Sequence, residues 1–409
     1  MSLKEFYYKG TLPASKSILN RLLLMASYAE PNTVQIEGDS ACDDVQLMKA
    51  GILSLAQQKP IHCGFAGAVL RFLALKAARI PGRHILYGHK RLFERPQQPL
   101  LDNLQKLGVR AMIKYATQPK LIIDSEGWKP SRGALVVDRS ISSQFASGIV
   151  LNAWGLPFDL SLRFSSESVS PSYLELSLAL VKTLGMKIQR DSEEEIIIPA
   201  LQKPAAGTYR AESDMSSAFA VAALAAVNGR ALVEHFPEKS LQPDYVFVDL
   251  LKKMGANVSL HKSVLEVEKA EHLKHINCNL RNAPDLFPVL AVLCALADGV
   301  SVLSGAPHLT HKESNRILKV MDLIQLMGRE VEERADGLLI HGNSTPFSAE
   351  KKMYNPDGDH RLAMAAAVAM QAGLNLELKT PEVVNKSFPE FWEIFLCHSE
   401  LVRRISSDD

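Results

Sequence analysis

Several features that mark other classes of protein are missing from this chain of 409 residues. Its formal net charge is only +1, so we expect no basic surface for nucleic acid or for acidic lipid. No apolar run reaches the length of a transmembrane helix, and the first residues, MSLKEFYYKG, lack the apolar stretch of a signal peptide. These absences predict a cytoplasmic protein with no membrane and no nucleic-acid partner.

Cysteine is scarce, and so are the usual cofactor motifs. The five cysteines form no Cys-x-x-Cys pair, which favours reduced thiols; Cys294, inside an apolar run, is typical of a buried free thiol. The chain has neither a phosphate loop of the GxxxxGK[ST] type nor a dinucleotide fingerprint. His308, His311 and Glu313 lie close in sequence, but no further ligand converges on them. We therefore expect no metal and no organic cofactor.

What the chain does contain is a phrase repeated six times: a polar cluster, then a small-residue apolar run, then a glycine or turn. Each run is long enough for a buried helix and ends in a stop signal, which places the polar cluster at a helix N-terminus. Helix N-termini carry bare N–H groups and a positive dipole end, so they suit anions. The six starts, 51 to 75 residues apart, are Lys16, Gly67, Ser142, Ser216, Asp285 and Asp359.

A second repeat supports the first. Four segments end in a glycine that is followed by alternating apolar and polar residues, which indicates a helix, a left-handed glycine stop and then a strand. Each unit therefore reads strand–helix–strand–helix–strand, and three units make one domain with apolar helices inside and sheets outside. The expected fold is α/β (α+β). The four glycines are Gly108, Gly185, Gly255 and Gly328.

Two crossings of the chain divide the six units into two similar domains. The Pro/Gly-rich stretch at 204–213 separates units three and four, and a second crossing lies at 10–14. We predict one domain over 15–212 (units 1–3) and a second over 1–14 together with 213–409 (units 4–6), with hinges at the two crossings.

Six motifs stand in order between Thr11 and Trp392, and together they resemble the enolpyruvyl transferase superfamily, most closely its 5-enolpyruvylshikimate-3-phosphate synthase family. The resemblance implies an inverse alpha-beta barrel in each domain. It also implies a reaction that joins an alcohol to phosphoenolpyruvate and expels phosphate through a tetrahedral intermediate. The motifs are PASKSILNR, SISSQF, SPSYLEL, HKESNR, DHRLAM and NKSFP.

The resemblance assigns the first domain to shikimate 3-phosphate. Lys16 touches both substrates, Ser17 and Arg21 hold the ring carboxylate, and the Ser142–Gln144 triplet holds the 3-phosphate and the ring. From the residues alone, a capped helix with two exposed cations and an ordinary serine N-cap stay open. The expected shikimate 3-phosphate ligands are Lys16, Ser17, Arg21, Ser142, Ser143, Gln144, Ser170, Tyr173, Asp285, His308 and Lys312.

The second domain is expected on the phosphoenolpyruvate side. Guanidinium groups suit carboxylate and phosphate because they present paired donors in a plane. Taken singly, each arginine could equally be a solvated surface residue, and the histidine a structural one. The expected phosphoenolpyruvate ligands are Lys16, Gly67, Arg95, Gln144, Glu313, Arg316, His360, Arg361 and Lys386.

Catalysis of this reaction needs cations and a few movable protons. The resemblance implies that Asp285 binds the acceptor hydroxyl and that Glu313 is the acid and base for the methylene carbon, with Lys16 and Lys386 completing the catalytic set. The sequence does not decide which group moves which proton. A simple helix cap for Asp285 and a plain surface helix for Glu313 stay open.

Some positions depart from the family pattern. Phe65 and Ala68 stand where the family has an asparagine and a threonine, and His308 replaces an asparagine. These changes leave the acceptor open: another cyclitol, a UDP-amino sugar, or no catalysis but binding of anionic metabolites. The UDP-sugar enzymes typically carry a cysteine before the Arg-Pro pair, and the stretch 89–94 has none. The expected partners are small-molecule substrates only, and we expect a monomer.

Overall fold

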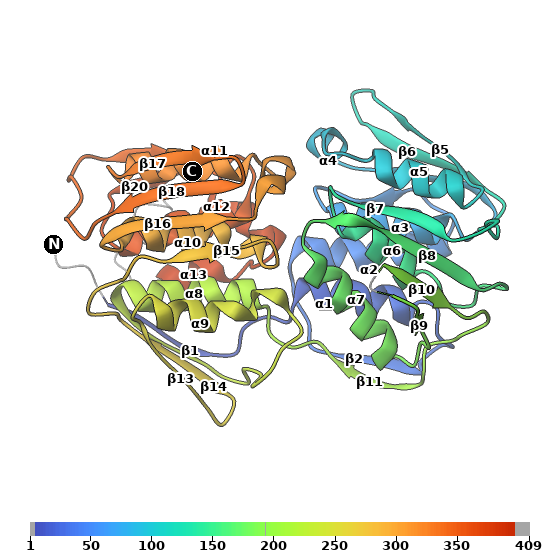
Figure 1. Cartoon of the computed structure of the whole chain (residues 1–409), viewed down its shortest axis with the longest axis horizontal. Helices are drawn as coiled ribbons and strands as arrows, with labels where there is room; N and C mark the ends of the chain where they lie inside the picture. The colour runs from blue at the N-terminus through green and yellow to red at the C-terminus, as the bar shows by residue number, and fades with distance from the viewer. Residues whose placement is uncertain (1–4, 193, 397–409) are drawn as a thin grey trace. The chain divides into compact units, whose positions relative to one another are not determined.

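The computed structural model describes residues 5–192 and 194–396. The chain divides into two compact units, each drawn in Figure 1. Unit 1 comprises 1–13 and 212–409, and unit 2 comprises 14–211. The sequence-based boundaries lie one residue further along the chain at both crossings.

Unit 2 contains seven of the described α-helices and three sheets. Its helices are α1 (Lys16–Ala26), α2 (Asp43–Ala56), α3 (Gly67–Ala77), α4 (Lys90–Glu94), α5 (Gln98–Lys106), α6 (Gln144–Leu151) and α7 (Pro171–Thr183). Its strands are β2 (Val34–Glu37), β3 (Ile61–His62), β4 (Gly82–Tyr87), β5 (Arg110–Lys114), β6 (Lys120–Ser125), β7 (Leu135–Arg139), β8 (Leu160–Ser168), β9 (Gln189–Arg190), β10 (Glu195–Ile198) and β11 (Gly207–Arg210).

Unit 1 repeats this plan and adds short 3₁₀ turns before several helices. Its helices are α8 (Met215–Asn228), α9 (Phe247–Lys253), α10 (Phe287–Leu296), α11 (Arg316–Leu326), α12 (His360–Gln371) and α13 (Phe391–Leu396), with 3₁₀ turns η1 (Pro243–Val246), η2 (Pro284–Leu286), η3 (Pro307–His311) and η4 (Pro381–Lys386). Its strands are β1 (Phe6–Gly10), β12 (Gly229–Val233), β13 (Asn257–His261), β14 (Val264–Glu268), β15 (Asn277–Asn279), β16 (Gly299–Ser304), β17 (Glu330–Arg334), β18 (Gly337–Gly342), β19 (Lys352–Tyr354) and β20 (Leu376–Leu378).

The sheets show the predicted duplication directly. Four sheets have the same order, in which a parallel pair is extended by two antiparallel strands: β3-β4-β6-β5, β7-β8-β10-β9, β1-β12-β14-β13 and β15-β16-β18-β17. The third sheet of each unit is a single parallel pair, β11-β2 or β19-β20. Three repeats per unit are therefore present, one of them with a reduced sheet.

Apolar helices form the interior of each unit, as their composition predicts. Nearly every residue of α3, α6, α8, α10 and α12 is buried, whereas strands such as β6 alternate between buried and partly exposed residues. A glycine allows two of these helices to approach closely: a Cβ on Gly148 of α6 would lie 2.7 Å from Leu75 of α3. All six polar clusters stand at helix starts, because α10 follows directly on the 3₁₀ turn η2 that contains Asp285.

Other local predictions are confirmed as well. Gly108, Gly185, Gly255 and Gly328 end their helices with φ of 78°, 93°, 91° and 69°, in the left-handed region that glycine adopts without strain. Cys294 is a buried free thiol, and Cys397 lies outside the described residues. Among the described residues, the helices are too short or too polar to cross a membrane.

Candidate active site

Unit 1 brings three carboxylates onto one buried guanidinium. Arg316, the first residue of α11, is only 1% exposed. Its Nε lies 2.7 Å from Oδ2 of Asp359, its Nη1 lies 2.8 Å from Oδ1 of Asp285, and its Nη2 lies 3.1 Å from Oε2 of Glu313. Burial opposes the charge, but these carboxylates outweigh it and raise the pKa of Arg316 above its ordinary value. The guanidinium is therefore always charged and fixes the positions of its three partners.

Asp285 is held between two arginines. Besides Arg316, it contacts Arg361, whose Nη2 lies 2.7 Å from its Oδ2. Burial raises the pKa of this carboxyl, but Arg361, Arg316 and Lys312 outweigh burial and hold the pKa well below its usual range. The N-cap of α10 is Leu286, so the simple-cap interpretation does not describe Asp285. The carboxylate is thus ionised and can accept a hydrogen bond.

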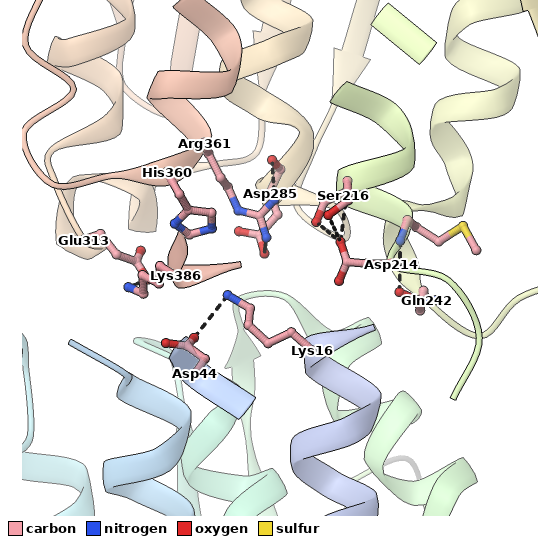
Figure 2. A network of polar contacts seen from close by, with 12 residues as sticks. Lys16, Asp44, Asp214, Ser216, Gln242, Asp285, Glu313, His360, Arg361 and Lys386 are labelled. Atoms are coloured by element: carbon pink, nitrogen blue, oxygen red, sulfur yellow. Dashed lines mark hydrogen bonds and ion pairs between the residues drawn. The ribbon is translucent and has the colours of Figure 1, made fainter. Parts of the chain in front are cut away.

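Glu313 lies in the loop between η3 and α11 and joins a second cation to the cluster. Its Oε1 is 2.9 Å from Nζ of Lys386, the last residue of η4, and both side chains are largely buried, at 15% and 8% exposed. Glu313 therefore bridges Lys386 and Arg316, and the surface-helix interpretation is wrong. Figure 2 shows Glu313, Lys386, His360, Arg361 and Asp285 in one view.

Two histidines lie beside this cluster in the structure. His360 opens α12 and is 1% exposed, with its Nδ1 3.8 Å from Oδ1 of Asp359. His308 lies in η3, where burial, followed by the charges of Lys312 and Arg316, lowers its pKa to about 3. His308 is therefore neutral near pH 7 and offers a hydrogen bond rather than a charge.

Unit 2 carries a different set of groups, beginning with α1. Lys16, its first residue, pairs with Asp44 of α2 at 3.2 Å, as Figure 2 shows. Arg21 is buried, and it donates from Nε to Oγ of Ser177 at 2.8 Å and from Nη1 to the Ser17 carbonyl at 2.8 Å. Its Nη2 donates to the Tyr173 carbonyl at 3.3 Å. The interpretation of these two cations as exposed residues on a capped helix is therefore wrong.

The serine and glutamine triplet stands at the start of α6. Ser143 is the N-cap residue, and its side chain makes no capping hydrogen bond, so a serine cap at this helix can come only from Ser142. The Ser142 hydroxyl instead accepts from the backbone N–H of Gln144 at 3.3 Å. Ser170 precedes α7 with a left-handed φ of 50°, and Tyr173 follows in its first turn. Ser142, Ser143 and Gln144 thus place three side-chain donors at the start of α6.

Arg95 and Gly67 lie together at the start of α3. A Cβ on Gly67 would lie 2.9 Å from Nη1 of Arg95, so the bare glycine leaves the room that this guanidinium occupies. Phe65, in the loop before α3, is 44% exposed and stacks on His89 with ring centres 4.0 Å apart. An exposed aromatic surface therefore borders this end of the helix.

The predicted site residues fall into one group in each unit. Unit 2 holds Lys16, Ser17, Arg21, Gly67, Arg95, Ser142, Ser143, Gln144, Ser170 and Tyr173, and unit 1 holds Asp285, His308, Lys312, Glu313, Arg316, His360, Arg361 and Lys386. Within unit 1 the structure joins six residues in one polar network: Asp285, Glu313, Arg316, Asp359, Arg361 and Lys386.

Three acidic residues at helix starts were not among the predicted site residues. Asp359 both holds Arg316 and caps α12 by accepting from the Arg361 N–H at 3.0 Å. Asp44 pairs with Lys16, and its only signal is its place in the acidic start of α2. Asp214 caps α8 through the Ser217 N–H at 2.9 Å and also accepts from the Ser216 hydroxyl (Figure 2). An acidic residue just before an apolar helix was the available signal for Asp214 and Asp359.

Comparisons with solved structures establish the class of fold. EPSP synthase from Acinetobacter baumannii matches with a TM-score of 0.76 at 22% identity, over 97% of this chain and 96% of that one. The enolpyruvyl transferase NikO from Streptomyces tendae matches with a TM-score of 0.72 at 13% identity, over 97% and 95%. The predicted fold is thus confirmed as that of the enolpyruvyl transferases.

Sequence comparison gives the particular family. The family described as EPSP synthase (3-phosphoshikimate 1-carboxyvinyltransferase) matches residues 52–395. A 3-phosphoshikimate 1-carboxyvinyltransferase of Syntrophobacter fumaroxidans is 30% identical over 94% of this chain and 95% of its own length. One of Methanoculleus marisnigri is 33% identical over 84% and 80%. The chain belongs to the EPSP synthase family.

Proposed function

We propose that this protein transfers the enolpyruvyl group of phosphoenolpyruvate to the 5-hydroxyl of shikimate 3-phosphate and releases phosphate, a step of the shikimate pathway. The observation that carries the proposal is the unit 1 network, in which Asp285 and Glu313 are each held by two cations. Such a network can bind an anionic substrate and place two carboxylates against its reacting carbons.

The chemistry has two steps, and the unit 1 carboxylates suit both. In the first, the acceptor hydroxyl loses its proton as its oxygen bonds to C2 of phosphoenolpyruvate, and C3 gains a proton as the C2–C3 double bond becomes single. In the second, C3 loses a proton, the double bond re-forms, and the bond from C2 to the phosphate oxygen breaks. Asp285, whose pKa lies well below its usual range, is a good hydrogen-bond acceptor but a weak base, so it orients the hydroxyl. Glu313 is the group assigned to the proton at C3, and Lys386 and Arg316 stabilise the negative charges around it.

Unit 2 supplies donors without carboxylates at the α6 start. Ser142, Ser143 and Gln144 offer hydroxyl, amide and backbone N–H groups, which suit the 3-phosphate of the acceptor. Arg21 and Tyr173 are assigned to the ring, and Arg95 to phosphoenolpyruvate. Each unit thus carries part of the set of residues assigned to the two substrates.

We further propose that the protein is a monomer and that it acts in the cytoplasm. One chain carries every residue assigned to the two substrates, so a monomer needs no second copy to complete its set. The described cysteines Cys42, Cys63, Cys278 and Cys294 are free thiols, which fits a reducing cytoplasm. Light scattering on the purified protein tests the oligomeric state, and a dimer would contradict it.

The direct test is phosphate release from phosphoenolpyruvate by purified protein, with and without shikimate 3-phosphate. We expect release that depends on shikimate 3-phosphate and falls at least ~100-fold in Lys16→Ala, because one positioned cation at a reacting anion contributes on that order. Lys49→Ala is the matched control, since Lys49 is an exposed partner of Asp39 in the same unit and should leave the rate unchanged.

The acceptor is tested in the same assay. The Phe65–His89 stack at the start of α3 favours trying other cyclitol phosphates beside shikimate 3-phosphate. Release with another acceptor only would keep the transferase and replace its substrate. Tight binding of phosphoenolpyruvate with no release for any acceptor would overturn catalysis and leave a binder of anionic metabolites.

A further inference from the structure

One buried arginine of α3 stands outside every motif that suggested the function. Arg71 interrupts the apolar run AVLRFLALKAA and is only 3% exposed. It lies four residues after Gly67, one helical turn along the same face of α3. That face contacts Arg95 through Gly67, so Arg71 lies next to a segment already assigned to phosphoenolpyruvate.

The guanidinium of Arg71 joins three separate segments of unit 2. Its Nη1 donates to Oε1 of Gln144 at 2.8 Å, its Nε to Oε1 of Gln97 at 3.2 Å, and its Nη2 to the carbonyl of Pro96 at 3.1 Å. Its central carbon lies 4.6 Å from the centre of the Phe145 ring. The side chain therefore ties α3 to the residues that follow Arg95 and to the start of α6.

These contacts fix the orientation of the Gln144 amide. Arginine only donates hydrogen bonds, so the amide oxygen of Gln144 must face Arg71, and the NH₂ group must face the other way. The same logic applies to Gln97, where the opposite end is independently accounted for: its Nε2 donates to the Leu92 carbonyl at 2.8 Å. Gln144 is thereby set to present two N–H donors, which is what an anionic ligand requires.

We propose that Arg71 is a positioning residue of the active site, which holds Gln144 and the segment after Arg95 so that both donate to phosphoenolpyruvate. The inference rests on the proposed function for the identity of the ligand. Without Arg71 the Gln144 amide can turn its oxygen toward the anion, and the Pro96 carbonyl loses a charged donor. The effect on the ligand is indirect, through Gln144 first.

A double-mutant cycle tests this arrangement. Arg71→Met and Gln144→Ala are each expected to lower kcat/KM for phosphoenolpyruvate at least tenfold. The double variant should lose at least fivefold less than the product of the two single losses, because both changes remove one interaction. Gln144→Glu should be as inactive as Gln144→Ala although it keeps a partner for Arg71, since it has no N–H to donate. A loss in the double variant equal to the product would overturn the proposal.

The matched control is Arg79→Met. Arg79 is a second arginine near α3, just past its C-terminal end, and donates to the Asn152 and Trp154 carbonyls at the other end of α6. Arg79→Met should lower thermal stability as Arg71→Met does. Its effect on kcat/KM should simply multiply with that of Gln144→Ala, without coupling between the two changes. Coupling of Arg79 to Gln144 as strong as that of Arg71 would show a general structural effect and overturn the positioning role.

The positioning role of Arg71 can also be measured without catalysis. If the wild type releases no phosphate, the cycle is measured instead as dissociation constants for phosphoenolpyruvate and for inorganic phosphate by calorimetry. Coupling of at least fivefold there supports the positioning role even without catalysis. Independent effects, or no binding of either anion by the wild type, overturn it.

Discussion

The two units hold the buried arginines of their candidate sites in opposite ways. In unit 1, Arg316 contacts three carboxylates and its pKa is raised above the ordinary value. In unit 2, Arg21 contacts a serine hydroxyl and two backbone carbonyls, and burial lowers its pKa to about 10. Arg71 likewise bonds to two amides and a carbonyl. At these positions unit 1 pairs its arginines with acids, and unit 2 surrounds its arginines with neutral acceptors.

The difference matters for what each unit can bind. A cation bonded to neutral acceptors keeps its full charge for an incoming phosphate, whereas a cation already paired with carboxylates gives less net attraction. Carboxylates held among cations are useful in another way, because they stand ready to orient a hydroxyl or move a proton. Lys16 with Asp44 is the exception in unit 2. The comparison therefore favours recognition of the acceptor's 3-phosphate in unit 2 and proton handling in unit 1.

The strongest way to break this comparison is Arg316→Met. We expect it to destabilise unit 1 by about 3–5 kcal/mol, because it leaves Asp285, Glu313 and Asp359 buried without their shared cation. Hydrogen exchange measured peptide by peptide should show faster exchange over 212–396 and little change over 14–211. Phosphate release should be lost as well.

The control for Arg316 is Arg230→Met, in the same unit. Arg230 pairs with Glu266 and Glu268 on an exposed sheet surface, where ion pairs contribute little. Its exchange pattern should match the wild type. Equal changes in hydrogen exchange for the two substitutions would mean that the buried network stabilises unit 1 no more than an exposed ion pair does. The contrast between the two units would then be contradicted.

A second prediction concerns a cation of unit 2 that lacks the compensation seen in unit 1. Lys76, in the last turn of α3, is 9% exposed and lies 3.6 Å over the ring of Tyr28, and burial lowers its pKa to about 7. In the unfolded chain this amine is protonated below about pH 10.4, but in the folded chain it is protonated only below about pH 7. The free energy of unfolding therefore rises as pH increases from about 7 to about 10.4. Between pH 7.5 and 9 the wild type should gain about 2 kcal/mol relative to Lys76→Met.

The fluorescence of tryptophan makes this measurement specific to unit 2. Trp128 and Trp154 lie in unit 2 and Trp392 in unit 1, so denaturant unfolding in a Trp392→Phe background reports on unit 2 alone. Lys106→Met is the control, because Lys106 also stands in the last turn of a helix and donates to a backbone carbonyl, but it is exposed. The same pH dependence in both variants would contradict a buried, weakly compensated amine.

Some of these features could be predicted from the sequence, and others could not. Helix starts, glycine stops and the six-fold repeat are local signals, since an apolar run and a glycine at its end determine them within a few residues. The partners within the site are not local: Asp285 meets Arg316 31 residues away and Arg361 76 residues away. No spacing rule predicts which acid pairs with which cation, because packing of α10, α11 and α12 decides it.

Arg71 is a second residue whose partners could not be predicted from the sequence. A single arginine within an apolar helix was a visible signal of a buried, bonded cation. Its partners Gln97 and Gln144 come from a loop and from another helix, and only the packing of α3 against α6 brings them together. The reduced third sheet of each unit was equally hidden, since strand pairing depends on contacts that short alternating segments do not specify.

The smallest expected effect concerns His308, a neutral side chain of unit 1 with charged neighbours. His308 is 6% exposed, and burial, with Lys312, Arg316 and Arg281 nearby, lowers its pKa to about 3 although Asp285 opposes the shift. Below the ordinary histidine pKa of about 6.5 the unfolded chain takes up a proton that the folded chain refuses, so stability falls as pH decreases from there toward 3. Between pH 6.5 and 5.5 the wild type should lose about 1 kcal/mol more than His308→Gln in denaturant unfolding. His261→Gln, which removes an exposed histidine of the same unit, should keep the wild-type slope. If His308→Gln keeps that slope too, His308 takes up its proton in the folded chain, and unit 1 would offer the acceptor phosphate a charge at this position.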